Sequence, residues 1–375
     1  MRLSLCALLA LLATAACAQA YSVLEDVPYD SLEGVDQNLL SLDVYRPVGD
    51  GPFPVVVFVH GGGWYLGDKR STVHAKAGWL TGRGVLLVSV NYRLSPTPTS
   101  RPSPDRITFP THPSDVGRAL DFVRANAASW GGDASRLVLM GHSAGAHLAS
   151  LVGVDGRYST GEAPACVVSL DTNAYNIPAY LASGPSALQR AIYVNAFTSD
   201  PDVQVAASPV THLGTASRPS FLIVHQEQPD RTATADGFLD ALRLAGLEAD
   251  RVTTTLEHDE INRLLGSDAA PALTTAVEDV LDGCFGVATA TSDGPDRGDV
   301  RVSPNPSDGR IRLALPSGGT LSRIRVVDAQ GRTVVRTRAR GRVHDLDVSH
   351  LAPGTYLVVV RGRGRVTSER ITVAR

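Results

Sequence analysis

Short apolar runs recur along the first two thirds of the chain and alternate with stretches of helical spacing. The runs are continuous and rich in β-branched residues, which is typical of strands buried on both faces of a parallel sheet. They span residues 54–59, 84–90, 136–140, 166–168 and 221–224. Between two of them, Val116, Leu120 and Val123 recur at helical spacing until Trp130 and Gly131 end the pattern. We therefore predict an α/β fold with a doubly wound, mostly parallel sheet.

The last part of the chain follows a different rule, because apolar and polar residues alternate there with a period of two. Residues 310–315 and 356–360 are such runs, and turn signals at 317–319 and 329–331 interrupt the pattern. Short strands separated by frequent turns are typical of a small all-β sandwich, here of the immunoglobulin-like kind. Residues 288–300 consist mostly of Thr, Ser, Asp, Gly and Pro, and we interpret them as a linker.

The first twenty residues have the pattern of an export signal. A charged start at Arg2 is followed by an apolar run from Leu3 to Ala13 and by small residues up to Ala20. The run is too short to span a bilayer, which needs about 20 apolar residues, and no later segment reaches that length. Cys17 leaves a lipidated N-terminus as an alternative. The predicted organisation is a signal peptide over 1–20, an α/β domain over 21–287, a linker over 288–300 and a β-sandwich over 301–375.

Composition excludes several classes of protein. The 375 residues are 43% hydrophobic and 19% charged, which is unlike a disordered, collagen-like or coiled-coil protein. The net charge of −3 is unevenly divided, since residues 301–375 hold 15 Arg against 5 acidic residues. No helical or aromatic nucleic-acid reader accompanies these arginines, so we interpret them as a solvated β-surface and expect no nucleic-acid partner.

Two cysteines remain once the signal peptide is removed. Cys166 lies in an apolar run that reads as a buried strand, and Cys284 lies near the end of the α/β domain. An exported protein meets an oxidising compartment, where the two could pair. We nevertheless expect Cys166 to act as a small buried hydrophobe.

The candidate chemistry lies in the turns that follow the strands. Gly141-His142-Ser143-Ala144-Gly145 stands between the strand at 136–140 and a helix rich in small residues. Small residues on both sides allow the sharp strand-to-helix turn that exposes a serine hydroxyl, the nucleophile elbow. Ser143 is therefore the predicted nucleophile.

A glycine run directly ends the strand at 54–59. The segment His60-Gly61-Gly62-Gly63-Trp64 lets backbone N–H groups face a developing oxyanion, and Ala144 supplies a further donor from the elbow. We predict an oxyanion hole from Gly62, Gly63 and Ala144. The chemistry that these residues support needs no metal ion and no organic cofactor.

The remaining catalytic groups are expected in the order serine, acid, histidine. His258 follows the strand-like residues 251–256 and precedes a helix, which is the position of a histidine that reaches back over the sheet. We place the acid on the loop after residues 221–225 and choose Asp230. Asp171, at the end of the strand that contains Cys166, is the rival.

Motifs throughout residues 35–285 resemble the carboxylesterases of the α/β-hydrolase fold, including feruloyl-esterase-like and kynurenine-formamidase-like members. The resemblance rests on HGGGW at 60–64, NYRLSP at 91–96, GHSAGAHLA at 141–149 and the EINR that follows His258. It implies a secreted serine carboxylesterase that acts through an acyl-serine intermediate on a small-molecule or polysaccharide-linked ester. An arylformamidase and a catalytically silent surface-binding protein are the alternatives.

A long segment, 172–213, precedes the proposed acid loop and is expected to cap the substrate pocket. It contains Tyr175, which we predict together with Trp64 as a substrate contact, although such aromatic residues can also belong to the core.

The tail resembles the C-terminal sorting domain of the type IX secretion system. PNPSDG at 304–309, DAQG at 328–331, LAPGTY at 351–356 and the final Arg375 carry this resemblance. It implies the type IX secretion machinery as a partner, and a location at the cell surface or outside a Gram-negative bacterium.

Overall fold

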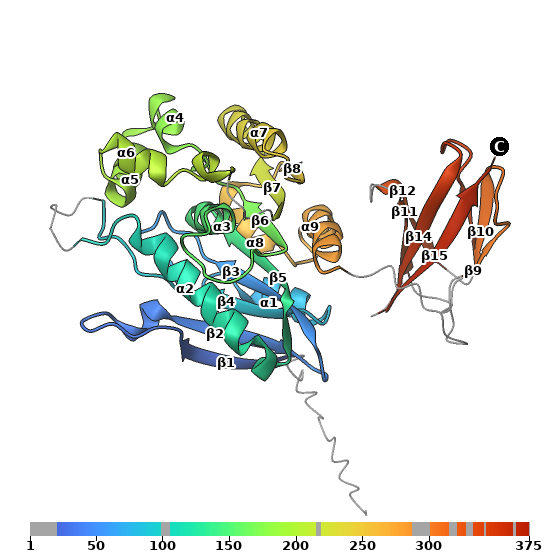
Figure 1. The fold of residues 1–375 in the computed structure, drawn as a ribbon, viewed down its shortest axis with the longest axis horizontal. Coiled ribbons are helices and arrows are strands. Elements are labelled where there is room, and N and C mark those ends of the chain that lie inside the picture. The colour runs from blue at the N-terminus through green and yellow to red at the C-terminus, as the bar shows by residue number, and fades with distance from the viewer. Residues whose placement is uncertain are drawn as a thin grey trace, which may run out of the picture. The chain divides into compact units, whose positions relative to one another are not determined.

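The computed structural model describes residues 21–98, 106–214, 219–286, 301–314, 321–327, 333–340, 343–362 and 365–374. The predicted signal peptide, with Cys17, and the predicted linker lie outside these residues. The chain divides into two compact units, Met1–Val277 and Glu278–Arg375, so the division falls inside the last helix (Figure 1).

The first unit is built on an eight-stranded sheet. Its strand order is β1-β2-β4-β3-β5-β6-β7-β8, and the pairing is parallel from β4 to β8, whereas β1 and β2 are antiparallel. The strands are β1 (Tyr21–Pro28), β2 (Ser41–Pro47), β3 (Phe53–Val59), β4 (Leu86–Val90), β5 (Gly132–His142), β6 (Cys166–Leu170), β7 (Ser220–Gln226) and β8 (Ala249–Thr254). The predicted doubly wound, mostly parallel sheet is confirmed.

Helices follow the strands, as the alternating pattern predicts. They are α1 (His74–Thr81), α2 (Thr111–Asn126), α3 (Ala144–Val154), α4 (Ile177–Ala182), α5 (Ala187–Phe197), α6 (Pro201–Ala206), α7 (Pro229–Leu244), α8 (His258–Leu264) and α9 (Pro271–Cys284). Short 3-10 turns occupy Gln37–Leu40, Ala127–Trp130 and Pro209–His212. The predicted cap, 172–213, forms α4, α5 and α6, which Figure 1 shows as one cluster of short helices.

Burial follows the position of each element in the sheet. β4 and β6 are buried at every position, because central parallel strands have neighbours on both sides and helices on both faces. β8 alternates between half-buried and exposed residues, as expected at a sheet edge. Every residue of α3 is buried, which explains why this helix contains only small and apolar side chains with His147 and Ser150.

The second unit contains two antiparallel sheets, β13-β10-β9 and β12-β11-β14-β15. The strands are β9 (Arg301–Ser303), β10 (Arg310–Ala314), β11 (Leu321–Val327), β12 (Thr333–Arg340), β13 (Val343–Asp347), β14 (Gly354–Gly362) and β15 (Arg365–Val373). One apolar core joins both sheets, with Leu313 and Leu346 from the first and Val326, Val358 and Ile371 from the second. The prediction of a small all-β sandwich is confirmed.

The cysteines differ from the expectation. Cys166 is 3% exposed, as a buried hydrophobe would be, but both Cys166 and Cys284 are disulfide-bonded. The prediction that Cys166 is only a packing residue is therefore wrong. Burial in a strand and disulfide formation do not exclude each other when the chain folds in an oxidising compartment.

Within the described residues, every helix is too short or too polar to cross a membrane.

Candidate active site

Ser143 occupies a tight turn between β5 and α3. Its backbone has φ 55° and ψ −117°, a conformation that residues with a side chain rarely adopt. The neighbours make this turn possible because they are glycines. A Cβ on Gly141 would lie 2.2 Å from the carbonyl oxygen of Gly145, and a Cβ on Gly145 would lie 2.1 Å from that of Val59. The local sequence thus forces the hydroxyl of Ser143 to the end of the central strand.

His258 is the first residue of α8 and lies against the serine. Its Nε2 is 3.0 Å from Ser143 Oγ, and its Nδ1 is 2.6 Å from Asp171 Oδ2. The ring of His142 packs beside that of His258 with centroids 4.5 Å apart, and its Nε2 lies 2.9 Å from the His258 carbonyl oxygen. Burial lowers the pKa of His142 to about 3, so this second imidazole is neutral and supports the first without adding charge.

Asp171 is the carboxylate that holds His258. It follows β6 at φ 54°, is fully buried, and its Oδ1 accepts the backbone N–H of Gln226 at 3.1 Å. Arg231 places Nη1 3.0 Å from Asp171 Oδ2. Burial acts to raise the pKa of Asp171, but the His258 hydrogen bond and the Arg231 charge outweigh it and hold the pKa below its usual value. Asp171 is therefore ionised beside the imidazole.

The choice of Asp230 as this acid is wrong. Pro229 starts α7 immediately after the β7 loop, so Asp230 sits in the first turn of a helix and not on a loop. It lines a pocket of about 330 Å³ between α4 and α7. The next residue, Arg231, reaches the site instead, and the rival Asp171 occupies the position beside His258.

The glycine run lies beside the serine. A Cβ on Gly61 would come within 3.1 Å of Ser143 Cβ, so this backbone passes directly by the nucleophile. Gly62 and Gly63 have positive φ values of 114° and 58°, and a Cβ on Gly62 would lie 1.9 Å from the Leu66 carbonyl oxygen. Only glycine allows this turn. Within the described part of the chain, the N–H groups of Gly62, Gly63 and Ala144 have no hydrogen-bond acceptor.

The two predicted substrate contacts are both buried. Trp64 is 2% exposed, donates from Nε1 to His147 Nδ1 at 3.2 Å and packs edge-on against Tyr193 and Phe197 of α5. Trp64 therefore holds the glycine turn against α5. Tyr175 is also 2% exposed, and its hydroxyl lies 2.6 Å from Ser169 Oγ. Tyr175 stacks on Phe238 and lines the pocket that contains Asp230.

Sequence reasoning missed the contribution of α7. Arg231 directly follows Asp230 in the sequence. Nothing in the local pattern distinguishes an arginine that pairs with a buried carboxylate from one at the surface. The backbone N–H of Gln226 also supports Asp171. Any residue except proline could donate this hydrogen bond, so the sequence contains no signal for it.

A serine on a sharp turn after a central parallel strand, with an imidazole and a carboxylate from later strand ends, defines an α/β-hydrolase fold. The BD-FAE family model matches residues 42–235, just over half of the chain, and the protein belongs to this family. Residues 301–374 match the secretion system C-terminal sorting domain. Both resemblances drawn from the sequence motifs are confirmed.

Individual proteins support the same classification. The chain is 31% identical over 268 residues to the probable carboxylic ester hydrolase LipM and 30% identical over 239 residues to the esterase LipQ, both from Mycobacterium tuberculosis. These matches cover 67% and 59% of the chain, but only 60% and 53% of those two relatives. Esterase B from Lactobacillus rhamnosis superposes with a TM-score of 0.60 at 17% identity, covering 71% of this chain and 88% of that one. The last comparison concerns the fold alone.

Proposed function

We propose that the protein is a secreted serine carboxylesterase that hydrolyses carboxylic esters through an acyl-serine intermediate. The observation that carries the proposal is the continuous contact from Asp171 to His258 to Ser143, with distances of 2.6 Å and 3.0 Å. The similarity to LipM and LipQ, whose names describe ester hydrolases, points to the same chemistry.

In the proposed reaction His258 Nε2 takes the proton of Ser143 as Oγ attacks the ester carbonyl. Asp171 fixes the imidazole through Nδ1 and stabilises the imidazolium that forms. The oxyanion of the tetrahedral intermediate is bound by the N–H groups of Gly62, Gly63 and Ala144, each worth about 10²- to 10³-fold in rate. Collapse of the intermediate expels the alcohol, which is protonated by His258, and leaves Ser143 acylated.

Deacylation repeats the same steps with water as the nucleophile. His258 takes a proton from the water that attacks the acyl-serine carbonyl, the same N–H groups bind the second oxyanion, and the proton returns to Ser143 Oγ as the carboxylic acid leaves. Every group that this mechanism uses belongs to the chain itself. The substrate is proposed to be a small-molecule or polysaccharide-linked ester.

The two ends of the chain support export as part of the proposal. The signal-like residues 1–20 are expected to direct the chain across the inner membrane, and the sorting domain to direct it through the type IX secretion machinery. The proposed location is the surface or the surroundings of a Gram-negative cell.

The test is hydrolysis of p-nitrophenyl butyrate by residues 21–375, with Ser143→Ala as the matched control. We expect Ser143→Ala to lower kcat by at least ~10⁴-fold, because the nucleophile is lost while the fold is kept. Turnover that survives the substitution rules out an acyl-serine at this residue. Faster hydrolysis of formanilide than of the ester replaces the carboxylesterase with an amide hydrolase of the arylformamidase type.

A further inference from the structure

Lysine is used in this chain in an unusual way. Of the 35 basic residues 33 are Arg, and the two lysines, Lys69 and Lys76, are both completely buried. An ammonium is a compact charge with three donors, whereas the guanidinium of Arg is a larger planar fork. The sequence thus has Arg at all other basic positions and Lys at the two positions where the amine is enclosed by protein.

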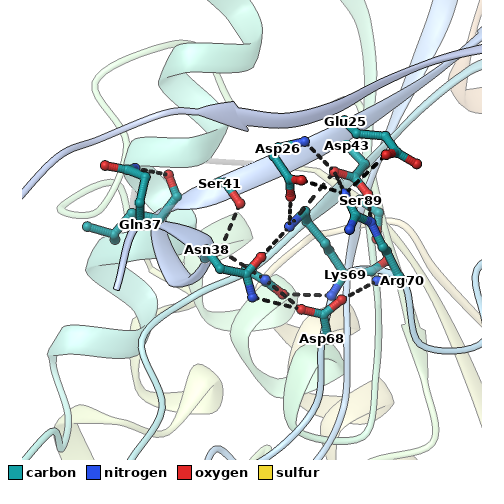
Figure 2. A network of polar contacts seen from close by, with 12 residues as sticks. Glu25, Asp26, Gln37, Asn38, Ser41, Asp43, Asp68, Lys69, Arg70 and Ser89 are labelled. Carbon is teal, nitrogen blue, oxygen red and sulfur yellow. Dashed lines mark hydrogen bonds and ion pairs between the residues drawn. The ribbon is translucent and has the colours of Figure 1, made fainter. Parts of the chain in front are cut away.

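Lys69 is enclosed by side chains from the β1–β2 edge of the sheet. Its Nζ donates to Asn38 Oδ1 at 2.6 Å and lies 2.8 Å from Asp26 Oδ1 and 3.8 Å from Asp43 Oδ1 (Figure 2). Asp43 is itself fully buried. Burying an ammonium and a carboxylate costs several kcal/mol for each ion unless the two are paired and hydrogen-bonded, so this arrangement is a fixed one.

The backbone of Lys69 is held as firmly as its side chain. Its N–H donates to Asn91 Oδ1 at 2.6 Å, and its carbonyl oxygen accepts from Ser89 Oγ at 2.6 Å. Asn91 also donates to Asp68 Oδ2 at 3.0 Å. Burial would raise the pKa of Asp68, but hydrogen bonds from Asn91, the Arg70 backbone and Asn38 lower it to about 2. We call Lys69, Asp26, Asn38, Asp43, Ser89 and Asn91 the Lys69 cluster.

Arg70 shares the same carboxylates from outside. Its Nε lies 2.7 Å from Asp43 Oδ2 and its Nη2 lies 2.9 Å from Asp26 Oδ2, but its side chain is 43% exposed. Figure 2 shows both cations converging on this pair of acids. Arg70 thus balances the charge of the Lys69 cluster without touching Asn38, Ser89 or Asn91.

The Lys69 cluster is joined to the glycine turn by close backbone contacts. A Cβ on Gly67, two residues before Lys69, would lie 2.5 Å from both the Gly61 carbonyl oxygen and His60 Nδ1. Leu66 in turn donates its N–H to the Gly62 carbonyl oxygen at 3.0 Å. Because Gly67 packs directly against the Gly61 carbonyl oxygen and the buried His60 ring, a shift of residues 68–70 is passed to Gly61 and Gly62.

We propose that Lys69 is a positioning residue for the oxyanion hole, fixing the turn at Gly61–Gly63 by anchoring the backbone that follows it to β1, β2 and β4. This inference rests on the proposed function and adds a residue that does not touch the substrate. The amides of Gly62 and Gly63 must lie within about 0.5 Å of the productive geometry, and Lys69 is what holds their loop there.

The test compares Lys69→Met with Arg70→Met in residues 21–375. Active sites are first counted by phosphonylation of Ser143 with a p-nitrophenyl phosphonate, and kcat is expressed per active site. We expect Lys69→Met to lower kcat by about 10- to 100-fold with KM changed less than about twofold, because an oxyanion donor acts mainly in the transition state. Arg70→Met, which keeps the ammonium contacts to Asn38 and Asp26, is expected to stay within about twofold of wild type.

A trifluoromethyl ketone provides a second readout that a merely structural role does not move. Its hemiketal oxyanion needs the same N–H groups, so its affinity is expected to fall by the same factor as kcat. An unchanged kcat per active site, or a change confined to KM, overturns the proposal. Absence of Ser143-dependent hydrolysis in the wild type instead overturns the proposed function, so the two failures are distinguishable.

Two further variants separate a loss of folding stability from a loss of activity. Lys69→Met leaves Arg70 as the one cation beside both Asp26 and Asp43, and adding Asp43→Asn removes the excess negative charge. The double variant is expected to recover melting temperature but not kcat, whereas recovery of both contradicts the proposal.

Asn38→Ala removes one acceptor of the ammonium without unpairing a charge. It is expected to lower kcat severalfold, and a wild-type kcat in this variant also counts against the proposal.

Discussion

The α/β unit and the β-sandwich treat charge in opposite ways. The α/β unit buries Lys69, Lys76, Asp43, Asp115 and Asp171 together with several histidines. In the described part of the β-sandwich, 301–374, Ser307 is the one buried polar side chain, and the core is aliphatic apart from Tyr356. Burying ionisable groups is costly unless each has a partner. In the α/β unit Lys69 pairs with Asp26, Asp115 with Arg93 and Asp171 with His258, so these buried ions are held in fixed places.

Among the substitutions in the α/β unit, the largest loss of activity is expected at Asp171. Asp171→Asn keeps the shape of the side chain but removes the charge that stabilises the His258 imidazolium, so kcat should fall by about 10⁴-fold. Asp230→Asn is the matched control and should leave kcat within about twofold. Both are measured with p-nitrophenyl butyrate, and the reverse ranking would restore Asp230 as the acid.

Acid should unfold the α/β unit before the sandwich. Burial lowers the pKa of His60 and His147 to about 4 and that of His112 and His142 to about 3. In the unfolded chain a histidine has a pKa near 6.5, so below pH 6.5 the unfolded state binds more protons than the folded state. The free energy of unfolding is therefore unaffected above pH 6.5 and falls as the pH drops toward the folded-state pKa values. Because each pKa unit corresponds to about 1.4 kcal/mol, protonation of these four buried groups costs on the order of the whole stability of a typical domain.

The fluorescence of tryptophan measures this transition selectively, because all three tryptophans, Trp64, Trp79 and Trp130, belong to the α/β unit. We expect a cooperative loss of the native signal between about pH 5 and pH 4, with uptake of about four protons. The far-ultraviolet β signal of the isolated residues 301–375 serves as the comparison. A stability of the α/β unit that does not change between pH 7 and pH 4 contradicts the prediction.

A smaller effect is expected at Arg231. Arg231→Met removes the cation beside Asp171, but the carboxylate keeps its contacts with His258 and the Gln226 N–H. The pKa of Asp171 should rise, and kcat at neutral pH should fall by about 3- to 10-fold, well short of Asp171→Asn. Arg157→Met is the control, since Arg157 pairs with Asp155 at the end of α3. An equal loss in both variants argues against a specific role for Arg231.

The smallest effect should come from the sandwich. Arg312 pairs with Asp345 across β10 and β13, with side chains 64% and 63% exposed. Solvent screens such a pair, so Arg312→Ala should change the melting temperature of residues 301–375 by less than ~1 °C. Calorimetry is the measurement. A shift of several degrees would show that surface ion pairs stabilise this unit. The two units would then differ less in how much charged side chains contribute to their stability.

Contiguous sequence predicted the features that are encoded locally. Gly141 and Gly145 around Ser143, and the glycines at 61–63, impose turns that few other residues can make. The sheet and the sandwich followed from continuous and alternating apolar runs. The expected order serine, acid, histidine along the chain restricts the position of His258.

Contacts between distant segments could not be read in the same way. Asp171 and Asp230 both follow a strand of the same parallel sheet, and both strand ends lie near the histidine, so pattern alone does not choose between them. Arg231 pairs with the carboxylate of Asp171, which is 60 residues away in the chain, and Asn91 binds the backbone of Lys69, 22 residues earlier. Such pairings depend on how strands are ordered in the sheet, which no local spacing determines.

The two buried lysines have a practical consequence. The folded protein offers no side-chain amine to an N-hydroxysuccinimide ester or to the protease Lys-C, because both targets are enclosed. Acylation or cleavage at these residues must therefore wait until the surrounding structure opens. Lys69 and Lys76 serve as built-in chemical probes, one beside the glycine turn and one in α1, and their separate rates of modification would show which of the two regions opens first.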